Sequence, residues 1–161
     1  MKDNITMRKI FLFIVCLVVP LTIGAISGIA TSSGLKDWYF NLNKPSFNPP
    51  NYLFGPVWSF LYLLMGMSFY LILQETKSPL RKKAINIFIL QLSLNFLWSF
   101  LFFKFQLLGL AFIEILLIWL SILWMILEFK KLNKTAAYLQ IPYLLWVSFA
   151  SLLNGTIWWI N

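Results

Sequence analysis

The sequence contains no histidine, and Cys16 is its only cysteine. A disulfide within the chain and zinc sites built from cysteine and histidine are therefore excluded. A Ser-His-Asp or Cys-His nucleophile and haem ligation by histidine are excluded for the same reason. Neither GxGxxG nor GxxxxGK[ST] occurs, so these phosphate-binding loops are missing too. We expect no metal site and no required cofactor.

Charged residues are also scarce: they make up 11% of the 161 residues, whereas 60% are hydrophobic and 19% aromatic. Soluble domains carry about a quarter charged residues. A soluble protein of this length could not bury so much apolar surface, so the composition predicts an integral membrane protein. The net charge of +8 could indicate nucleic-acid binding. However, the basic residues lie between apolar runs, where membrane orientation explains them, and no nucleic-acid partner is expected.

Five apolar runs are long enough to cross about 30 Å of hydrocarbon, which takes roughly 20 helical residues. The first run follows "MRK", as in a cleaved signal peptide, but it exceeds the roughly 7–15 apolar residues of such a peptide. We therefore expect it to be retained. The pattern predicts an all-α, five-transmembrane-helix bundle in which residues 1–161 form a single domain. The expected spans are about 10–31, 52–74, 85–103, 106–127 and 136–158.

Basic residues are distributed unequally between the two sides of this bundle. Ten of the thirteen lie at the N-terminus or in the second and fourth connections, and the other three are Lys36, Lys44 and Lys104. Lysine and arginine favour the cytoplasmic side of a membrane. The bias predicts a cytoplasmic N-terminus, with the first loop and the C-terminus outside.

The first connection, residues 32–51, is expected to be the only substantial loop. It combines prolines, which remove backbone donors and disfavour a regular helix, with several aromatic residues. Long ordered loops often serve as lids, whereas aromatics at the headgroup level are common membrane anchors. Composition leaves both interpretations open. The residues concerned are Trp38, Tyr39, Phe40, Pro45, Phe47, Pro49 and Pro50.

Three spans each carry a line of aromatic side chains with an amide or hydroxyl on the same helix face. Packing alone could explain these lines. Membrane helix interfaces usually use small residues, however, and facing tryptophans favour a cavity for a flat, apolar ligand with one or two polar groups. The lines are Phe54, Trp58, Tyr62, Met65 and Phe69; Gln91, Asn95, Trp98 and Phe102; and Pro142, Trp146, Ala150, Asn154 and Trp158.

Two further features have more than one explanation. Glu114 is the only carboxylate deep in a predicted span, where it is expected to be protonated or hydrogen-bonded. It could contact a ligand, carry a proton or bond a neighbouring helix. Gly24 and Gly28 form a GxxxG match, which permits close helix contact within the chain or in a dimer.

Three stretches resemble the TspO/MBR family of translocator proteins, peripheral-type benzodiazepine receptors and bacterial tryptophan-rich sensory proteins. They are "WYFNLNKPSFNPPNYLFGPVWSFLYLLMGMS", "LQLSLNFLWSFLFF" and "IPYLLWVSFASLLN", and the resemblance covers about residues 35–159. It implies a five-helix bundle in a bacterial cell membrane, commonly a homodimer, whose first loop covers a pocket. The family binds tetrapyrroles such as protoporphyrin IX, isoquinoline carboxamides and benzodiazepines.

The resemblance also assigns ligand-binding positions, by motif. They are Tyr39 and Pro49 in the lid, Phe54, Trp58 and Tyr62 in span two, Asn95 and Trp98 in span three, Trp146 and Ala150 in span five, and, more loosely, Glu114. The chain departs from the family at "LLNGTIWWIN", which lacks the tyrosine and basic residue of the animal cholesterol pattern and puts cholesterol binding in doubt. Phe47 stands where many relatives have tryptophan.

The resemblance implies tetrapyrrole transport or sensing, with the ligand stacked between Trp58, Trp98 and Trp146. The ligand carboxylates would lie near Lys36 or Lys44. The alternative is light- and oxygen-dependent porphyrin degradation by Trp58 and Trp146. A membrane scaffold or stress-response regulator that acts through a partner is a third class. In each case prolines stiffen the first loop, so that little ordering entropy is lost when it closes as a lid.

Overall fold

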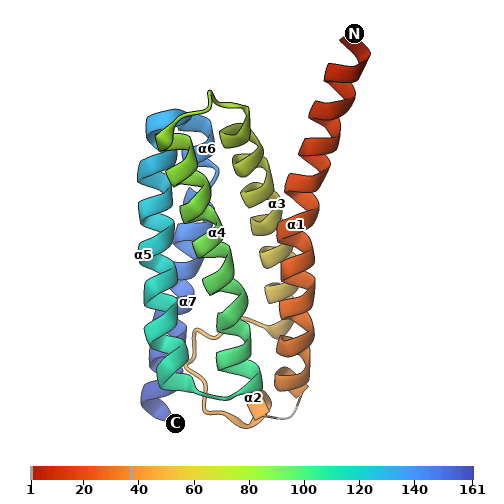
Figure 1. Cartoon of the computed structure of the whole chain (residues 1–161). Helices are drawn as coiled ribbons and strands as arrows, with labels where there is room; N and C mark the ends of the chain where they lie inside the picture. Colours follow the sequence, from red (N-terminus) through yellow and green to blue (C-terminus); the bar gives the residue numbers. More distant parts are fainter. Residues whose placement is uncertain (1, 37) are drawn as a thin grey trace.

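The structure is a computed structural model that describes residues 2–36 and 38–161, apart from the side chains of 2–5, 33, 35 and 36. The described residues contain helices and connections but no strand. Five long helices run up and down in one bundle (Figure 1). The elements are α1 Lys2–Lys36, α2 Trp38–Asn41, α3 Asn51–Gln74, α4 Pro79–Ser99, the π-helical turn η1 Phe100–Lys104, α5 Leu108–Leu132, α6 Lys134–Tyr138 and α7 Ile141–Ile160.

The five-span prediction is confirmed. Five helical segments are long and apolar enough to cross a membrane; the third combines α4 with η1, and the fifth combines α6 with α7. The helices extend past several predicted limits because polar and basic residues continue them beyond the apolar part. The spans are Thr6–Ser32, Asn51–Gln74, Pro79–Lys104, Leu108–Leu132 and Lys134–Ile160.

The prediction that all of residues 32–51 form a loop is wrong in its first half. Helix α1 continues to Lys36, and α2 takes up the aromatic residues Trp38–Asn41. Only residues 42–50 between α2 and α3 are irregular. Pro56 is the sixth residue of α3, so its missing N–H removes one helical hydrogen bond close to the start of the helix.

Local sequence signals set where α4 and α6 begin. Ser78 caps α4 by accepting a hydrogen bond from the Arg81 backbone N–H at 3.1 Å, with a proline in the first turn. Asn133 caps α6 by accepting from the Ala136 N–H at 3.0 Å. The Ser68 hydroxyl of α3 donates to the Ala136 carbonyl at 2.7 Å. These bonds close the end of the bundle that carries α6.

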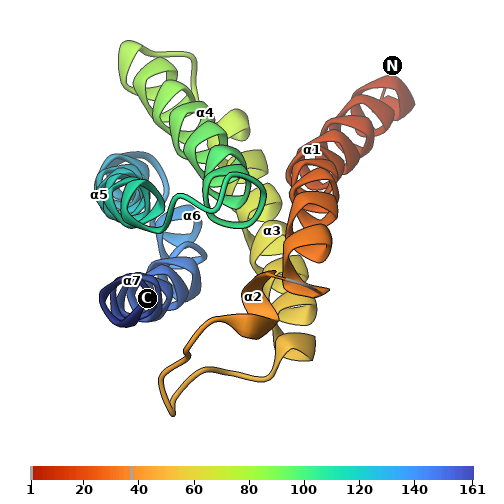
Figure 2. The same ribbon diagram turned by 90° about the horizontal axis from the view of Figure 1, so that it is seen from below.

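The two ends of the bundle differ. The N-terminus, the α3–α4 connection and α6 lie at one end, while α2, the first loop and the C-terminus lie at the other (Figure 1). Viewed from that second end, the first loop reaches out from α2 and returns to α3 on the side where α3 and α7 stand apart (Figure 2). Helix α5 packs against α4 and α7, and α1 packs mainly against α3.

The closest approach of α1 to α3 depends on Gly66 rather than on the GxxxG match. A Cβ at Gly66 would lie 2.5 Å from the Cys16 carbonyl oxygen and 2.8 Å from Leu17 Cα, so the two backbones touch there. A Cβ at Gly28 would meet nothing within 4 Å, and one at Gly24 would meet the Tyr62 ring. Gly24 therefore faces the Tyr62 ring and Gly28 faces open space, so neither glycine of the GxxxG match contacts another backbone.

We expect Gly66→Ala to lower the free energy of unfolding by about 1–3 kcal/mol, because the added methyl group pushes α1 away from α3. Gly28→Ala is the matched control, since both changes favour the helix equally but only one creates a clash. Thermal unfolding in detergent micelles would compare the two variants. Equal midpoints for the two would contradict the proposed role of Gly66.

Candidate ligand-binding cavity

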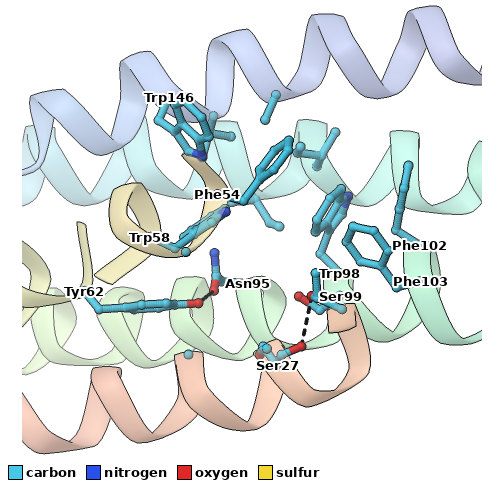
Figure 3. A pocket seen from close by; sticks show the side chains of 18 of the residues that line it. Ser27, Phe54, Trp58, Tyr62, Asn95, Trp98, Ser99, Phe102, Phe103 and Trp146 are labelled. Carbon is cyan, nitrogen blue, oxygen red and sulfur yellow. Dashed lines mark hydrogen bonds between the residues drawn. The ribbon is translucent and has the colours of Figure 1, made fainter. Parts of the chain in front are cut away.

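A cavity of about 410 Å³ lies between the helices in the half of the bundle next to the first loop. Helix α1 contributes small residues to its wall, among them Gly24, Ala25 and Gly28, which leave room for it. Helices α3, α4 and α7 and the turn η1 contribute aromatic side chains (Figure 3). Ile115 and Ile118 of α5 complete the wall. The enclosure is therefore mostly apolar and aromatic.

The aromatic rings are arranged as flat walls. Trp98 stacks on Phe102 with ring centres 5.0 Å apart, at the junction of α4 and η1. Across the cavity, Phe54 of α3 meets Trp146 of α7 edge to face at 6.1 Å. Trp58 lies one helical turn beyond Phe54, beside the cavity (Figure 3). Such walls suit a flat aromatic ligand.

One end of the cavity has a polar floor, made by hydrogen bonds among three helices. The Tyr62 hydroxyl donates to Asn95 Oδ1 at 2.6 Å (Figure 3). Asn95 Nδ2 in turn donates to the Tyr143 hydroxyl oxygen at 2.9 Å, which also accepts from Gln91 Nε2 at 2.5 Å. Tyr62 and Asn95 line the cavity, while Gln91 and Tyr143 are buried behind them. The chain links α3, α4 and α7.

A second polar contact braces the wall nearer the first loop. Trp98 Nε1 donates to Asn154 Oδ1 at 3.3 Å, and Asn154 Nδ2 donates to the Leu108 carbonyl at 3.4 Å. This places α4, α5 and α7 together around the Trp98 ring. The indole is thereby fixed in the cavity wall, where Phe102 stacks on one of its faces.

Eight of the ten expected ligand-binding residues line the cavity together. Pro49 does not line it: the residue lies in the loop, where its carbonyl accepts a bond from Asn48 Nδ2 at 3.1 Å. The structure thus brings the expected positions on α3, α4 and α7 and Tyr39 together around one cavity, and ligand binding by them stays a prediction. The eight are Tyr39, Phe54, Trp58, Tyr62, Asn95, Trp98, Trp146 and Ala150.

Glu114 also lies outside the cavity lining, so a contact with a ligand in this cavity stays a prediction. Ser121 and Glu128 follow it at seven-residue intervals, and Glu128 pairs with Lys83 of α4 at 2.8 Å. Because residues seven apart share a helix face, this line on α5 faces α4 rather than the cavity. Neither Glu114 carboxylate oxygen has a hydrogen-bond partner among the described residues.

The prediction from the sequence did not include Tyr143 or the part of the cavity wall that α1 contributes. The line chosen for span five includes Pro142 and Trp158, which are exposed, whereas Tyr143 and Val147 are fully buried one position along. A line through Tyr143, Val147 and Ser151 has the same spacing and would have pointed to the polar floor. The small residues of α1 carried no such signal, since glycine and alanine also mark ordinary helix packing.

The first loop is held at the cavity end of the bundle by contacts with α2 on one side and with the end of α7 on the other. The Tyr39 hydroxyl donates to Asn48 Oδ1 at 2.7 Å, and burial raises the pKa of Tyr39 to about 12, so it remains a donor at physiological pH. The Asn43 N–H donates to Asn161 Oδ1, and Asn161 Nδ2 donates to the Asn43 carbonyl, both at 3.0 Å. Phe47 packs edge-on against Phe149 of α7.

The fold and this cavity define a class: a multi-pass, all-helical membrane protein with an aromatic cavity beneath a proline-rich loop. Residues 16–160 match the TspO/MBR family. The chain is 36% identical over 158 residues to the tryptophan-rich protein TspO of Chlorobaculum tepidum, covering 96% of this chain and 98% of that one.

Two further relatives extend the comparison. The human translocator protein is 35% identical over 127 residues, which is 78% of this chain and 75% of that protein. The tryptophan-rich sensory protein of Cereibacter sphaeroides is 34% identical, with 83% of this chain and 85% of that one covered. The chain belongs to the TspO/MBR family.

We expect Asn161→Ala to speed amide hydrogen exchange in residues 42–50 by about tenfold, because it removes two hydrogen bonds that hold Asn43. Thr156→Ala, near the same end of α7, is the control, since that hydroxyl bonds to the carbonyl of Leu152 in its own helix at 2.8 Å. Hydrogen exchange with mass spectrometry would resolve the loop. Equal exchange in both variants would show that Asn161 does not hold it.

Proposed function

We propose that this protein binds tetrapyrroles such as protoporphyrin IX, and drug-like aromatic ligands such as isoquinoline carboxamides, in the cavity between its helices. Transport or sensing of the bound molecule is the role proposed, in keeping with the relatives' names, translocator protein and tryptophan-rich sensory protein. The observation that carries the proposal is the set of aromatic walls from α3, α4 and α7 that face one space.

The chemistry of the cavity supports a flat, mostly apolar ligand. Its volume of about 410 Å³ lies in the range of roughly 300–1,000 Å³ that is typical of sites for drug-sized molecules. Trp58, Trp98 and Trp146 offer ring faces, which contribute about 0.5–1.5 kcal/mol per aromatic pair beyond buried area. Asn95 on the polar floor can meet one polar group of the ligand.

Acidic groups of a tetrapyrrole would lie at the loop end. Lys44 Nζ is 5.0 Å from the centre of the Tyr39 ring, and Tyr39 lines the cavity. Lys44 also donates to the Phe40 carbonyl at 2.9 Å, so its charge is held over the loop end. The other lysine expected there, Lys36, has a side chain outside the described part of the structure. Lys44 is therefore the proposed partner of a ligand carboxylate.

The proposal includes the membrane setting. Ten basic residues lie toward the end that carries α6, and three lie toward the loop end. On this basis we place the N-terminus in the cytoplasm of a bacterial cell, with the loop and the C-terminus outside. A homodimer is proposed from the family resemblance. Ligand entry is then from the outer side or from the surrounding lipid.

We expect the double change Trp58→Ala/Trp146→Ala to weaken protoporphyrin IX binding by roughly 10- to 100-fold, because two ring contacts are lost. Trp159→Ala is the control, since that side chain is 86% exposed on α7. Changes in porphyrin absorbance on titration would report binding without depending on tryptophan fluorescence. Unchanged affinity in the double variant would overturn the assigned cavity.

An alternative use of the same cavity is light- and oxygen-dependent degradation of the bound tetrapyrrole. It is favoured by the position of two oxidisable indoles, Trp58 and Trp146, on one cavity. With no histidine in the chain, general acid–base catalysis has few groups to use, so the tryptophans would act through radical chemistry.

We expect Trp58→Phe/Trp146→Phe to keep most porphyrin binding, because phenyl rings preserve the flat walls, yet to slow light-driven product formation at least tenfold if the indoles react. Trp159→Phe would serve as the exposed control. Product formation would be followed by absorbance under illumination in air. A wild-type rate in the double variant would eliminate this mechanism while leaving ligand binding intact.

A further inference from the structure

A second hollow lies at the opposite end of the bundle, between the start of α4 and the last turns of α5. Its walls are Pro79, Lys82, Lys83, Asn86, Ile87, Leu90 and Trp124. None of these residues lines the aromatic cavity. Lys82, Asn86 and Leu90 recur at four-residue spacing and so share one face of α4. The hollow therefore runs along the helix from a basic end to an apolar end.

The basic end of the hollow has free hydrogen-bond donors. Within the described part of the chain, no hydrogen bond or ion pair engages the Lys82 ammonium or the Asn86 amide. Lys83 donates to Glu128 Oε1 at 2.8 Å, and its ammonium lies 5.5 Å from the centre of the Trp124 ring. Lys83 is thus held against α5, while Lys82 and Asn86 remain available to a ligand.

The local charge is positive. No carboxylate lines the hollow in the described part of the chain, and Glu128, which pairs with Lys83 of its wall, also accepts from Lys131 at 3.0 Å. At this end of the bundle, residues 75–83 and 128–134 together carry seven basic side chains and two carboxylates. The excess of positive charge around the hollow therefore favours an anionic ligand.

The apolar end of the hollow faces the lipid side of the bundle. Leu90 is 46% exposed and Trp124 is 44% exposed, although both lie within predicted membrane spans. Leu90 is eight residues beyond Lys82, or about 12 Å deeper along the helix. A molecule that fills the hollow would meet ammonium groups at the headgroup level, an indole at the boundary and aliphatic side chains below it.

We propose that this hollow binds an anionic phospholipid, with its phosphate between Lys82 and Asn86, its glycerol region against Trp124 and an acyl chain along Ile87 and Leu90. Charge complementarity selects an anionic over a zwitterionic headgroup, and the 12 Å apolar continuation selects a lipid over free phosphate. The site is separate from the aromatic cavity, so it does not depend on the proposed function.

Quenching by brominated lipid tests the proposal. The protein would be placed in phosphatidylcholine nanodiscs that contain a small fraction of phosphatidylglycerol brominated in the upper part of one acyl chain. The contribution of Trp124 is the quenching that is lost in Trp124→Phe. We expect phosphatidylglycerol to quench Trp124 at lower mole fractions than phosphatidylcholine brominated at the same position. Equal quenching by the two lipids would overturn the proposal.

Two lysine variants locate the headgroup. We expect Lys82→Gln to raise the phosphatidylglycerol fraction needed for half-quenching about fivefold, as the loss of one lysine near a membrane surface implies. Lys130→Gln removes an equal charge at the same end of the bundle but outside the hollow. It should change the phosphatidylglycerol fraction needed for half-quenching little. Equal effects of the two changes would mean a general surface attraction and would overturn the site.

A soluble competitor separates a lipid site from a phosphate site. Glycerol phosphate at millimolar concentration should not relieve the quenching, because it cannot use the apolar part of the hollow. Relief at that concentration would show that the hollow binds free phosphate and would overturn the lipid assignment. A thermal unfolding midpoint of Lys82→Gln equal to that of the unchanged protein would show that this variant is folded.

Discussion

The chain of hydrogen bonds from Tyr62 through Asn95 to Tyr143 and Gln91 is the interaction on which the cavity depends. In a bilayer, lipid solvates apolar side chains as well as a neighbouring helix does, so water does not drive α3, α4 and α7 together. Each interhelical bond contributes only about 0.6 kcal/mol, but an unpaired hydroxyl in hydrocarbon is costly. The pairing therefore fixes how these three helices are placed while leaving the space beside them open.

The bundle is consequently packed in one half and hollow in the other. On the α6 side of the chain of hydrogen bonds, Gly66 brings the backbones of α1 and α3 into contact, and Ser68 ties α3 to α6. On the loop side, Phe54 and Trp146 meet edge to face with ring centres 6.1 Å apart, and α1 presents Gly28 to open space. Large aromatic side chains on α3, α4 and α7 hold these helices apart, and glycines on α1 leave the space between them open; together they produce the cavity.

The sequence was sufficient for the span number and for most of the aromatic side chains of the cavity wall, because long apolar runs and regularly spaced aromatics are local signals. Prediction from the sequence failed for features that depend on how a helix is rotated about its axis, and for segments that lie outside the hydrocarbon. Tyr143 lies one position from the line predicted for span five, and only the packing of α7 on α5 with the bonds from Asn95 and Gln91 of α4 decides which way it points. The direction of Glu114 likewise depends on how α5 packs on α4, which is not a local property of the sequence. The helical first half of residues 32–51 was missed because polarity marks the end of the hydrocarbon span, not the end of a helix.

The first loop shows that lid and anchor are compatible descriptions of one segment. Helix α4 and η1 together cover 26 residues, or about 39 Å, which approaches the thickness of a bilayer with its headgroups. The loop, at the η1 end, thus lies at the headgroup level. There Tyr39 is 2% exposed and lines the cavity, while the adjacent Phe40 is 72% exposed. Neighbouring rings on α2 therefore differ in surroundings: Tyr39 is buried at the cavity and Phe40 is exposed at the outside of the bundle, which is the pattern expected of a segment that both covers a cavity and contacts a membrane interface.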